Sequence, residues 1–268
     1  MGLVDSYLGK VHSQMRFRGI YPINTELKIG DFGTLRGHRF IREGNLGVAT
    51  DMSKMGGVIA TESLELPVEG SEYDNKFSLG EARAVEFGAN ATVDNVVKVK
   101  AGLQVSFQSE FSAFVALSEM RVETMRNLKA VGDELVDRAA SNVWAYNGRF
   151  VVTQLIRASS MVLLLSSRAG TRVELEASGD VPQIDLAKAG LSFRLVYNDT
   201  GDSQFFPTDA KRAVVTPFFW VHGVDRGPFG WFRGGFNQLE AVAPGAMAPE
   251  PPPLEFRSES DPLSALRR

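Results

Sequence analysis

The sequence contains no cysteine among its 268 residues. This absence excludes a disulfide scaffold, a thiolate metal site and a cysteine nucleophile, and it fits the reducing environment of the cytoplasm. The histidines His12, His38 and His222 stand in three separate segments, so the sequence predicts no metal site. We therefore expect a cytoplasmic protein that needs no cofactor.

Long apolar runs and an excess of one charge are also missing. The longest aliphatic run, Met161 to Leu165, is far shorter than the about 20 residues that a membrane-spanning helix needs. The N-terminus MGLVDSYLGKVHSQ lacks the apolar centre of a signal peptide, although MGLVDS matches a myristoylation pattern at Gly2. With 29 Lys and Arg against 32 Asp and Glu, the chain has no general attraction to nucleic acid.

The sequence lacks the usual catalytic motifs. It contains no Gly-x-Ser-x-Gly, no His-Glu-x-x-His, no phosphate-binding loop and no dinucleotide fingerprint, and no carboxylate pair has the spacing of an acid and a base. We therefore predict that the protein is not an enzyme. The cluster RGPFGWFRGGF, from Arg226 to Phe236, leaves three interpretations open: a contact with single-stranded nucleic acid, a contact with the bilayer interface, or a loop that covers the core.

Two long segments alternate between apolar and polar residues. From Val97 to Leu117 only Ser109 of the odd positions is not apolar, and only Phe114 and Ala116 of the even positions are apolar. From Phe77 to Val93 the exceptions in the odd row are Glu81 and Arg83. A period of two is typical of a β-strand with one apolar face and one wet face.

The two segments are predicted to form an antiparallel hairpin. A two-residue loop at Asp94 and Asn95 would place Lys98 and Lys100 on the apolar face. A three-residue loop of Asp94, Asn95 and Val96 pairs Val93 with Val97 and brings both apolar rows to one side. We predict this second register, in which Glu81 lies opposite Ser109 and the polar exceptions cluster.

The remaining chain predicts two helices and several strands. The helices are expected at about Val4 to Arg18 and at Ser118 to Ser141, the second with Ser118 as N-cap and with a break at Gly132 as an option. The strands are expected at Phe150 to Leu165, Thr171 to Ala177, Leu191 to Tyr197 and Ala213 to His222, the first two forming a second hairpin about SSRAG. The predicted fold class is α+β: a twisted, mostly antiparallel sheet with long hairpins, packed against short helices.

The chain is predicted to consist of one domain, 1–240, and an extended proline-rich linker and tail, 241–268. The tail either frays or docks as an autoinhibitory element through Leu254, Phe256, Leu263 and Leu266. Between Lys10 and Arg42 the chain is locally basic, which predicts either a solvated face or a patch that binds lipid headgroups. The candidate headgroup-binding residues are Lys10, Arg16, Arg18, Arg36, Arg39 and Arg42.

The length of the alternating segments admits two interpretations. Seventeen alternating residues would reach roughly 55 Å as one strand, whereas a strand that crosses a bilayer needs about 9 to 11 residues. In a soluble sheet, each segment would be two strands broken at Gly80, Gly88 or Gly102, with the apolar face on the helix after Ser118. In a membrane, the hairpins of many copies would close a barrel with the apolar side toward lipid.

In the order of these segments and in their pattern of apolar and polar residues, the sequence resembles the bacterial gasdermins, pore-forming proteins of antiphage and cell-death defence. An N-terminal helix precedes a basic, glycine-rich region and the alternating hairpin, and Gly148 to Ser178 is similar to the strand that enters the family's second hairpin. The resemblance covers most of the first 240 residues. It implies an autoinhibited cytoplasmic monomer whose tail, after about Ala241, is removed by a protease, after which many copies assemble into a pore in the inner membrane.

Under this hypothesis each alternating residue has an expected environment in the pore. The residues expected to face lipid are Phe77, Leu79, Val85, Phe87, Leu103, Val105, Phe107 and Phe111. The residues expected to line the pore are Lys98, Lys100, Gln104 and Gln108. The alternative function is that of a soluble β-rich structural or adaptor protein, for example a phage or assembly component, without membrane activity.

Overall fold

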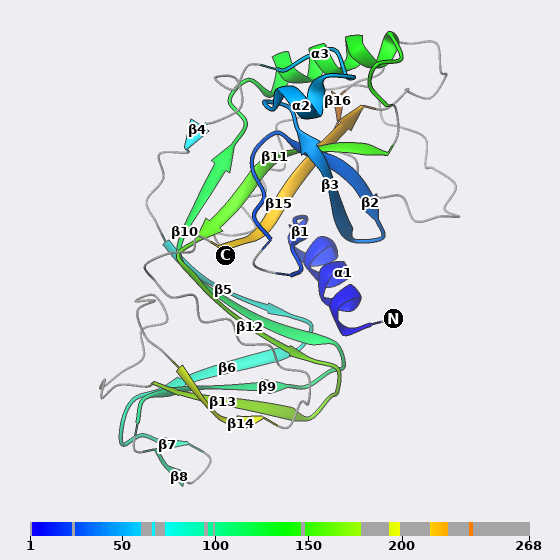
Figure 1. Cartoon of the computed structure of the whole chain (residues 1–268). Helices are drawn as coiled ribbons and strands as arrows, with labels where there is room; N and C mark the ends of the chain where they lie inside the picture. The colour runs from blue at the N-terminus through cyan, green and yellow to red at the C-terminus, as the bar shows by residue number, and fades with distance from the viewer. Residues whose placement is uncertain are drawn as a thin grey trace, which may run out of the picture.

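Antiparallel strands dominate the protein, as a computed structural model shows (Figure 1). The structure describes residues 2–22, 25–59, 66–67, 73–93, 96–98, 100–145, 148–177, 193–198, 215–224 and 236–237. Within these ranges every strand pair is antiparallel and three short helices occur, which confirms the predicted α+β class.

The upper part of Figure 1 is a sheet covered by two helices. Its central strand pairs with three neighbours, and a hairpin of two strands extends from its edge. The strands are β1 (Arg18–Gly19), β2 (Asp31–Arg36), β3 (Arg39–Asn45), β4 (Leu66–Pro67), β10 (Ser112–Thr124), β11 (Arg149–Ala158), β15 (Val215–Val224) and β16 (Phe236–Asn237). The helices are α2 (Ala49–Met52) and α3 (Leu128–Ala140).

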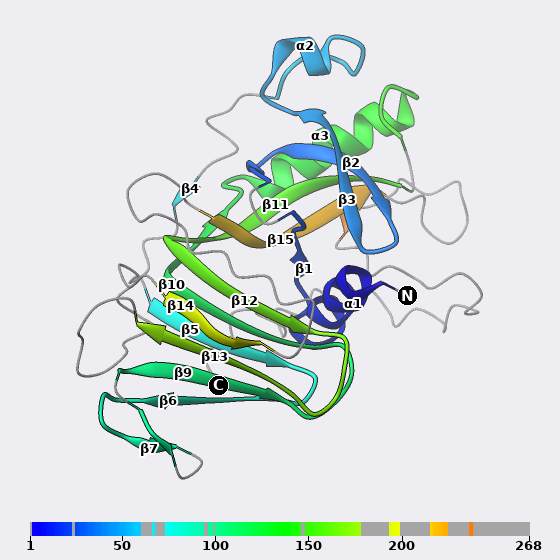
Figure 2. The same cartoon turned by 60° about the horizontal axis from the view of Figure 1, so that its bottom comes forward.

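The lower part is a sandwich of two sheets (Figures 1 and 2). In one sheet the lower half of β10 lies between β5 (Tyr73–Leu79) and β12 (Ser160–Ser166). The other sheet has the order β14-β13-β9-β6, and a small hairpin, β7 with β8, lies beyond it. These strands are β6 (Ala82–Phe87), β7 (Thr92–Val93), β8 (Val96–Val97), β9 (Gly102–Phe107), β13 (Thr171–Ala177) and β14 (Phe193–Asn198).

Helix α1 (Leu3–Met15) covers the outer face of the β5-β10-β12 sheet. Its apolar residues recur at helical spacing, so that Tyr7, Leu8 and Val11 share one buried face. The helix ends at Met15 and is capped by Arg16, whose φ of 63° is left-handed and whose amide donates to the His12 carbonyl. The observed helix confirms the predicted N-terminal helix and ends three residues before Arg18.

Three apolar cores follow from this arrangement. The odd residues of β10, Ala113, Val115 and Leu117, face α1, whereas Phe114 and Ala116 face the second sheet of the sandwich. Both faces of the lower half of β10 are therefore buried, which explains why Phe114 and Ala116 are the apolar exceptions in the even row. The third core lies between the upper sheet and helices α2 and α3.

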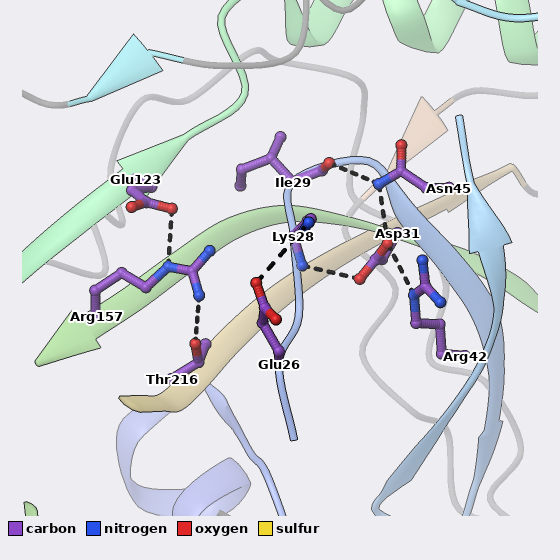
Figure 3. A network of polar contacts seen from close by, with 9 residues as sticks. All are labelled: Glu26, Lys28, Ile29, Asp31, Arg42, Asn45, Glu123, Arg157 and Thr216. Carbon is purple, nitrogen blue, oxygen red and sulfur yellow. Dashed lines mark hydrogen bonds and ion pairs between the residues drawn. The ribbon is translucent and has the colours of Figure 1, made fainter. Parts of the chain in front are cut away.

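A buried carboxylate anchors the upper hairpin of β2 and β3 (Figure 3). Asp31 accepts hydrogen bonds from the Asn45 side chain at 2.9 Å and from the Lys28 amide at 2.8 Å, and it pairs with Arg42 at 2.9 Å. Its side chain is 1% exposed, so these contacts replace its water completely. Asp31 thereby ties both strands of the hairpin to the segment before it.

Several predicted boundaries are wrong. The predicted helix at Ser118 to Ser141 is strand as far as Thr124, and α3 begins only at Leu128, so Ser118 is not an N-cap. The strand continues because residues 121–124 pair with β11, and this pairing outweighs a helical spacing of apolar residues. Helix α3 continues through Gly132 without a break.

The predicted loop of the first hairpin is also wrong. Val93 pairs with Val96 rather than with Val97. The two-residue loop is tolerated because Lys98 does not enter the apolar core: its ammonium lies 5.7 Å from the centre of the Phe87 ring and pairs with Glu174 at 2.6 Å. The positive charge of Lys98, which was the reason to reject this register, is thus compensated by the carboxylate of Glu174.

Each predicted long strand is divided. The segment of residues 77–93 is split among β5, β6 and β7, and residues 96–117 among β8, β9 and β10. Residues 150–165 are split between β11 and β12 after Ala158, and β12 does not pair with β13, so the second predicted hairpin is wrong. Breaks occur after Leu79, after Phe87 and before Gly102, as in the soluble interpretation, whereas the apolar face of β10 packs on α1 rather than α3.

We predict that Asp31→Ala lowers the free energy of unfolding by about 2–4 kcal/mol, because it leaves buried donors of Asn45 and the Lys28 amide without an acceptor. Chemical denaturation measures the loss. The control is Glu26→Ala, which removes an ion pair with Lys28 whose side chains are 72% and 60% exposed and which should change stability by less than about 0.5 kcal/mol. Equal effects of the two substitutions would contradict the anchoring role of Asp31.

Candidate functional site

The two sheets of the sandwich are one ribbon folded across itself. Three strands of the first sheet continue into three strands of the second through tight turns: β5 into β6, β10 into β9, and β12 into β13. The three strands keep the same order in both sheets. In the first sheet β10 lies between β5 and β12, and in the second sheet β9 lies between β6 and β13. Figures 1 and 2 show the three turns together at one end of the sandwich. We call residues 73–87, 102–118 and 160–177 the folded ribbon and the turns its bend.

Two strands of the folded ribbon keep one register through the bend. On one side Ser112 pairs with Ser166, and on the other side Phe107 pairs with Thr171. The turns between these pairs, 108–111 and 167–170, have the same length of four residues. If the bend were straightened, 102–118 and 160–176 would therefore form one continuous antiparallel pair without any slip.

The bend also inverts the apolar row. In β9 the odd residues Leu103, Val105 and Phe107 face the other sheet, whereas in β10 the odd residues face α1. The change occurs at the turn, where Phe111 has a left-handed φ of 54°. In a straight strand, residues of the same parity lie on one face. Straightening would therefore unite two apolar half-rows that the folded structure holds on opposite sides.

Hydroxyl groups stabilise the bend. Ser109 accepts a hydrogen bond from the Glu81 amide at 3.3 Å, and Ser112 donates to the Ser109 carbonyl at 2.8 Å. In the neighbouring turn, the hydroxyl groups of Ser166 and Thr171 form a hydrogen bond with an oxygen–oxygen distance of 2.6 Å. Turns need local partners for their backbone groups, and short hydroxyl side chains supply them. The polar exception Ser109 thus lies in the bend. It is close to Glu81 as predicted, but the register differs by one residue, because the Gln108 amide, rather than that of Ser109, donates to the Glu81 carbonyl.

Helix α1 holds two turns of the bend. The Lys10 ammonium donates to the Glu110 carbonyl at 3.4 Å, and the Gln14 side chain accepts from the Gly80 amide at 3.4 Å. The Tyr7 hydroxyl on the buried face of α1 is desolvated, and this burial raises its pKa. Displacement of α1 would uncover the odd row of β10 and release both turns.

Two ion pairs hold the halves of the folded ribbon in place. Lys76 of β5 pairs with Glu86 of β6 and so connects the two sheets along one edge. At the end far from the bend, Lys98 and Glu174 form a pair that is 15% and 6% exposed, and the Lys98 ammonium lies over the Phe87 ring. We call Lys98, Glu174, Phe87 and Gly102 the latch. Gly102 belongs to it because a Cβ atom there would lie 2.2 Å from the Phe87 ring.

The residues expected to face lipid occupy different environments. Leu103, Val105 and Phe107 are buried between the two sheets. Leu79 is buried and Phe77 half-buried against α1. The others are Phe87, which belongs to the latch, Val85, which is 51% exposed, and Phe111, which is half-buried at the bend.

The residues expected to line a pore lie on the outer face of the second sheet or near it. Gln104 is buried on that face beside Glu174, and Gln108 is exposed at the bend. Lys98 belongs to the latch, and Lys100 is half-buried. Sequence reasoning missed Glu174, although the alternating polar row Arg172, Glu174 and Glu176 was visible in the sequence.

The candidate headgroup-binding residues are spread over α1, β1 and the β2–β3 hairpin. Arg16 and Arg36 are exposed, whereas Arg39 pairs with Asp5 and Arg42 with Asp31. Arg18 is 3% exposed, and its burial lowers the pKa of the guanidinium. The structure thus does not bring all six predicted residues together. The tail residues Leu254, Phe256, Leu263 and Leu266 and most of the cluster after Arg226 lie outside the described residues.

Two further features bear on the kind of site. None of the described helices has the length and apolar character needed to span a membrane. Within the described part of the chain, no group of three or more His, Asp or Glu side chains is placed to hold a metal ion.

Comparison with protein families and with curated proteins found no match to this chain. Among solved structures, the chain is similar to the cryo-EM structure of the gasdermin A3 membrane pore. The similarity has a TM-score of 0.23 with 8% sequence identity, over 90% of this chain and 96% of that chain.

We predict that Glu174→Gln loosens the latch, because Lys98 then keeps a largely buried charge without its carboxylate partner. The Asn90 amide donates to the Lys98 carbonyl and the Lys98 amide donates to the Ala91 carbonyl, and both amides should exchange hydrogen faster. Hydrogen exchange with mass spectrometry measures this change. Asp133→Asn, which removes an ion pair on the exposed face of α3, is the control and should leave these amides unchanged. Unchanged exchange in Glu174→Gln would refute the latch.

Proposed function

We propose that this protein is an autoinhibited pore-forming effector whose folded ribbon straightens, inserts into a membrane and joins the ribbons of other copies. The observation that carries the proposal is the equal length of the turns 108–111 and 167–170, which lets two strands straighten in one register. A sandwich needs no such equality, since its turns can differ in length. The proposal agrees with the resemblance of the sequence to the bacterial gasdermins.

The straight ribbon suits a bilayer in polarity. On β9 and β13 its lipid face would carry Leu103, Val105 and Phe107 opposite Leu175, Val173 and Thr171. Its water face would carry Gln104 and Ser106 opposite Glu174 and Arg172. Alternation of this kind is what a membrane barrel requires, because lipid-facing and lumen-facing residues alternate along each strand.

When the two sheets of the sandwich separate, few apolar side chains between them would be left uncovered. Apolar side chains of β9 and β13 would exchange one apolar environment for another when they leave the sandwich for lipid. Phe114, Val162 and Leu164 of the first sheet would be uncovered, each at about 1.5–3 kcal/mol and in sum at roughly 5–9 kcal/mol. This sum is similar to the total stability of a typical domain, about 5–15 kcal/mol. The folded state therefore persists until a trigger and a membrane are both present.

The trigger we propose is release or cleavage of the tail, residues 241–268, by a protease. Proline-rich sequence of this kind is generally open to proteases, and an apolar end that docks would stabilise the folded state by its own docking energy. The inactive protein would then be cytoplasmic and the active oligomer would lie in the inner membrane, as expected for antiphage defence or cell death. A soluble structural or adaptor protein would instead keep the bend closed under all conditions.

The first test is leakage from vesicles. The full chain carries an inserted protease site after Ala241 and is cleaved in the presence of vesicles of phosphatidylethanolamine, phosphatidylglycerol and cardiolipin that contain a fluorescent dye. We expect dye release only after cleavage. The control is the unmodified chain with the same protease. Equal retention of dye with and without cleavage would favour the adaptor function and count against a pore.

The second test concerns the lumen. Gln108 is exposed at the bend, so Gln108→Lys should leave folding unchanged, yet it would add one positive charge per copy to the pore wall. We expect the pore to shift toward anions, measured as the reversal potential in planar bilayers under a salt gradient. Lys54→Gln, an exposed charge change outside the folded ribbon, is the control and should leave the reversal potential unchanged. An unchanged potential in Gln108→Lys would place Gln108 outside the lumen.

A further inference from the structure

The third strand of the folded ribbon, β5 with β6, does not keep its register through the bend. Leu79 pairs with Ala113 before the bend, and Ala82 pairs with Phe107 after it. Two residues lie between these positions on one strand and five on the other. The β6 strand is therefore three residues out of line with the register that β5 and β10 define.

This offset places β6 in a register that does not suit a membrane. Val85 now pairs with Gln104 and Phe87 with Gly102, so both share the polar face of the second sheet. Glu86 pairs with Leu103 and shares the apolar face. If the ribbon inserted in this register, Glu86 would face lipid, where a charge is unfavourable by up to a few kcal/mol.

We infer that β6 slides by three residues along β9, toward the bend, when the ribbon straightens, so that the register of β5 and β10 continues along its whole length. This inference rests on the proposed function. The slide moves β6 by roughly 10 Å at about 3.3 Å per residue. A slide by one residue would also unite the apolar rows, but it would leave a two-residue bulge at the former bend, whereas a slide by three leaves none.

From Val85 onward, the new register separates the apolar side chains from the polar ones. Val85 comes to pair with Phe107, Phe87 with Val105 and Ala89 with Leu103. On the other face, Glu86 comes to pair with Ser106 and Gly88 with Gln104. The exposed Val85 thereby gains an apolar environment, and Glu86, which is exposed in the folded state, remains in contact with water rather than with lipid.

The new register also brings together the polar exceptions of the apolar row, Glu81, Arg83 and Ser109. Arg83 comes to lie opposite Ser109, and Glu81 opposite Phe111, all at the former bend. The residues beyond them, 85–93, are nine in number and apolar at every odd position, which matches the about 9 to 11 residues of a membrane strand. Glu81, Arg83 and Ser109 would then lie at the level of the headgroups.

The latch is the device that keeps the resting register. The ring of Phe87 packs on Gly102, where no other residue would leave room for it, and Lys98 covers the ring and binds Glu174. In the new register Phe87 would move to the opposite face and Gly102 would lie opposite Asn90. Each contact of the latch is thus specific to the resting state.

Disulfide trapping distinguishes the registers, because the chain has no cysteine of its own. Ser106→Cys is combined in turn with Arg83→Cys, Ala84→Cys or Glu86→Cys, which report the resting register, a slide of one residue and a slide of three residues. Paired strand positions have Cα atoms about 4.5–5.5 Å apart, which suits a disulfide. Arg83, Ala84 and Glu86 are exposed and Ser106 is half-buried, so none of the substitutions enters a core.

We expect the Arg83→Cys pair to oxidise in the uncleaved chain, and the Glu86→Cys pair to oxidise only after cleavage on the phosphatidylethanolamine, phosphatidylglycerol and cardiolipin vesicles. Oxidised Arg83→Cys/Ser106→Cys should also abolish dye release, and a reductant should restore it. Thermal unfolding of each reduced variant confirms that it folds.

The outcomes separate the two proposals. If the cleaved chain releases dye but only the Ala84→Cys pair, or only the Arg83→Cys pair, oxidises on vesicles, the three-residue slide is wrong while the pore stands. Dye release that persists with the Arg83→Cys pair fully oxidised also overturns the slide. If the cleaved chain without cysteines releases no dye, the proposed function itself fails, and the slide fails with it.

Discussion

The structure depends on one constraint: a ribbon that is apolar along one face must hide that face from water. The protein meets this constraint by folding the ribbon at its middle. The far half of the apolar row then packs inside the sandwich, where Leu103, Val105 and Phe107 lie, and the near half packs beneath α1. The bend and α1 are therefore two parts of one solution, and their hydrogen bonds at Glu110 and Gly80 join them directly. Opening either part would expose an apolar row to water, which is unfavourable.

The class of the fold and the character of the ribbon could be predicted from the sequence. A period of two is a local property of a strand, and the apolar residues Leu103, Val105 and Phe107 that it indicated do lie together in one core, whereas Val85 is 51% exposed. Of the turns that form the bend, the soluble interpretation located the β5–β6 turn at Gly80, whereas the turn 108–111 could not be predicted, because its residues continue the alternation. Ser109 was its one visible mark, and it was interpreted as a defect in a straight strand.

The errors in the sequence prediction share one physical cause. Register and strand ends are set by partners far along the chain, as when β11 extends β10 through residues that have a helical spacing. Likewise, the position of Lys98 was decided by Glu174, which lies 76 residues away. A local pattern contains no information about such partners. The two-residue loop was excluded for an electrostatic reason that a distant carboxylate removes.

The central claim is that the folded ribbon straightens on a membrane, and one distance tests it most directly. Lys76 and Glu86 form an ion pair across the bend in the folded state, yet ten residues of one straight strand would separate them by roughly 33 Å. Spin labels are attached to the full chain with the cleavable tail through Lys76→Cys and Glu86→Cys. Pulsed electron paramagnetic resonance then measures the distance between the two labels. The account predicts a short distance in solution and one near this extended length after cleavage on vesicles. A distance that stays short on vesicles that are releasing their contents would contradict it.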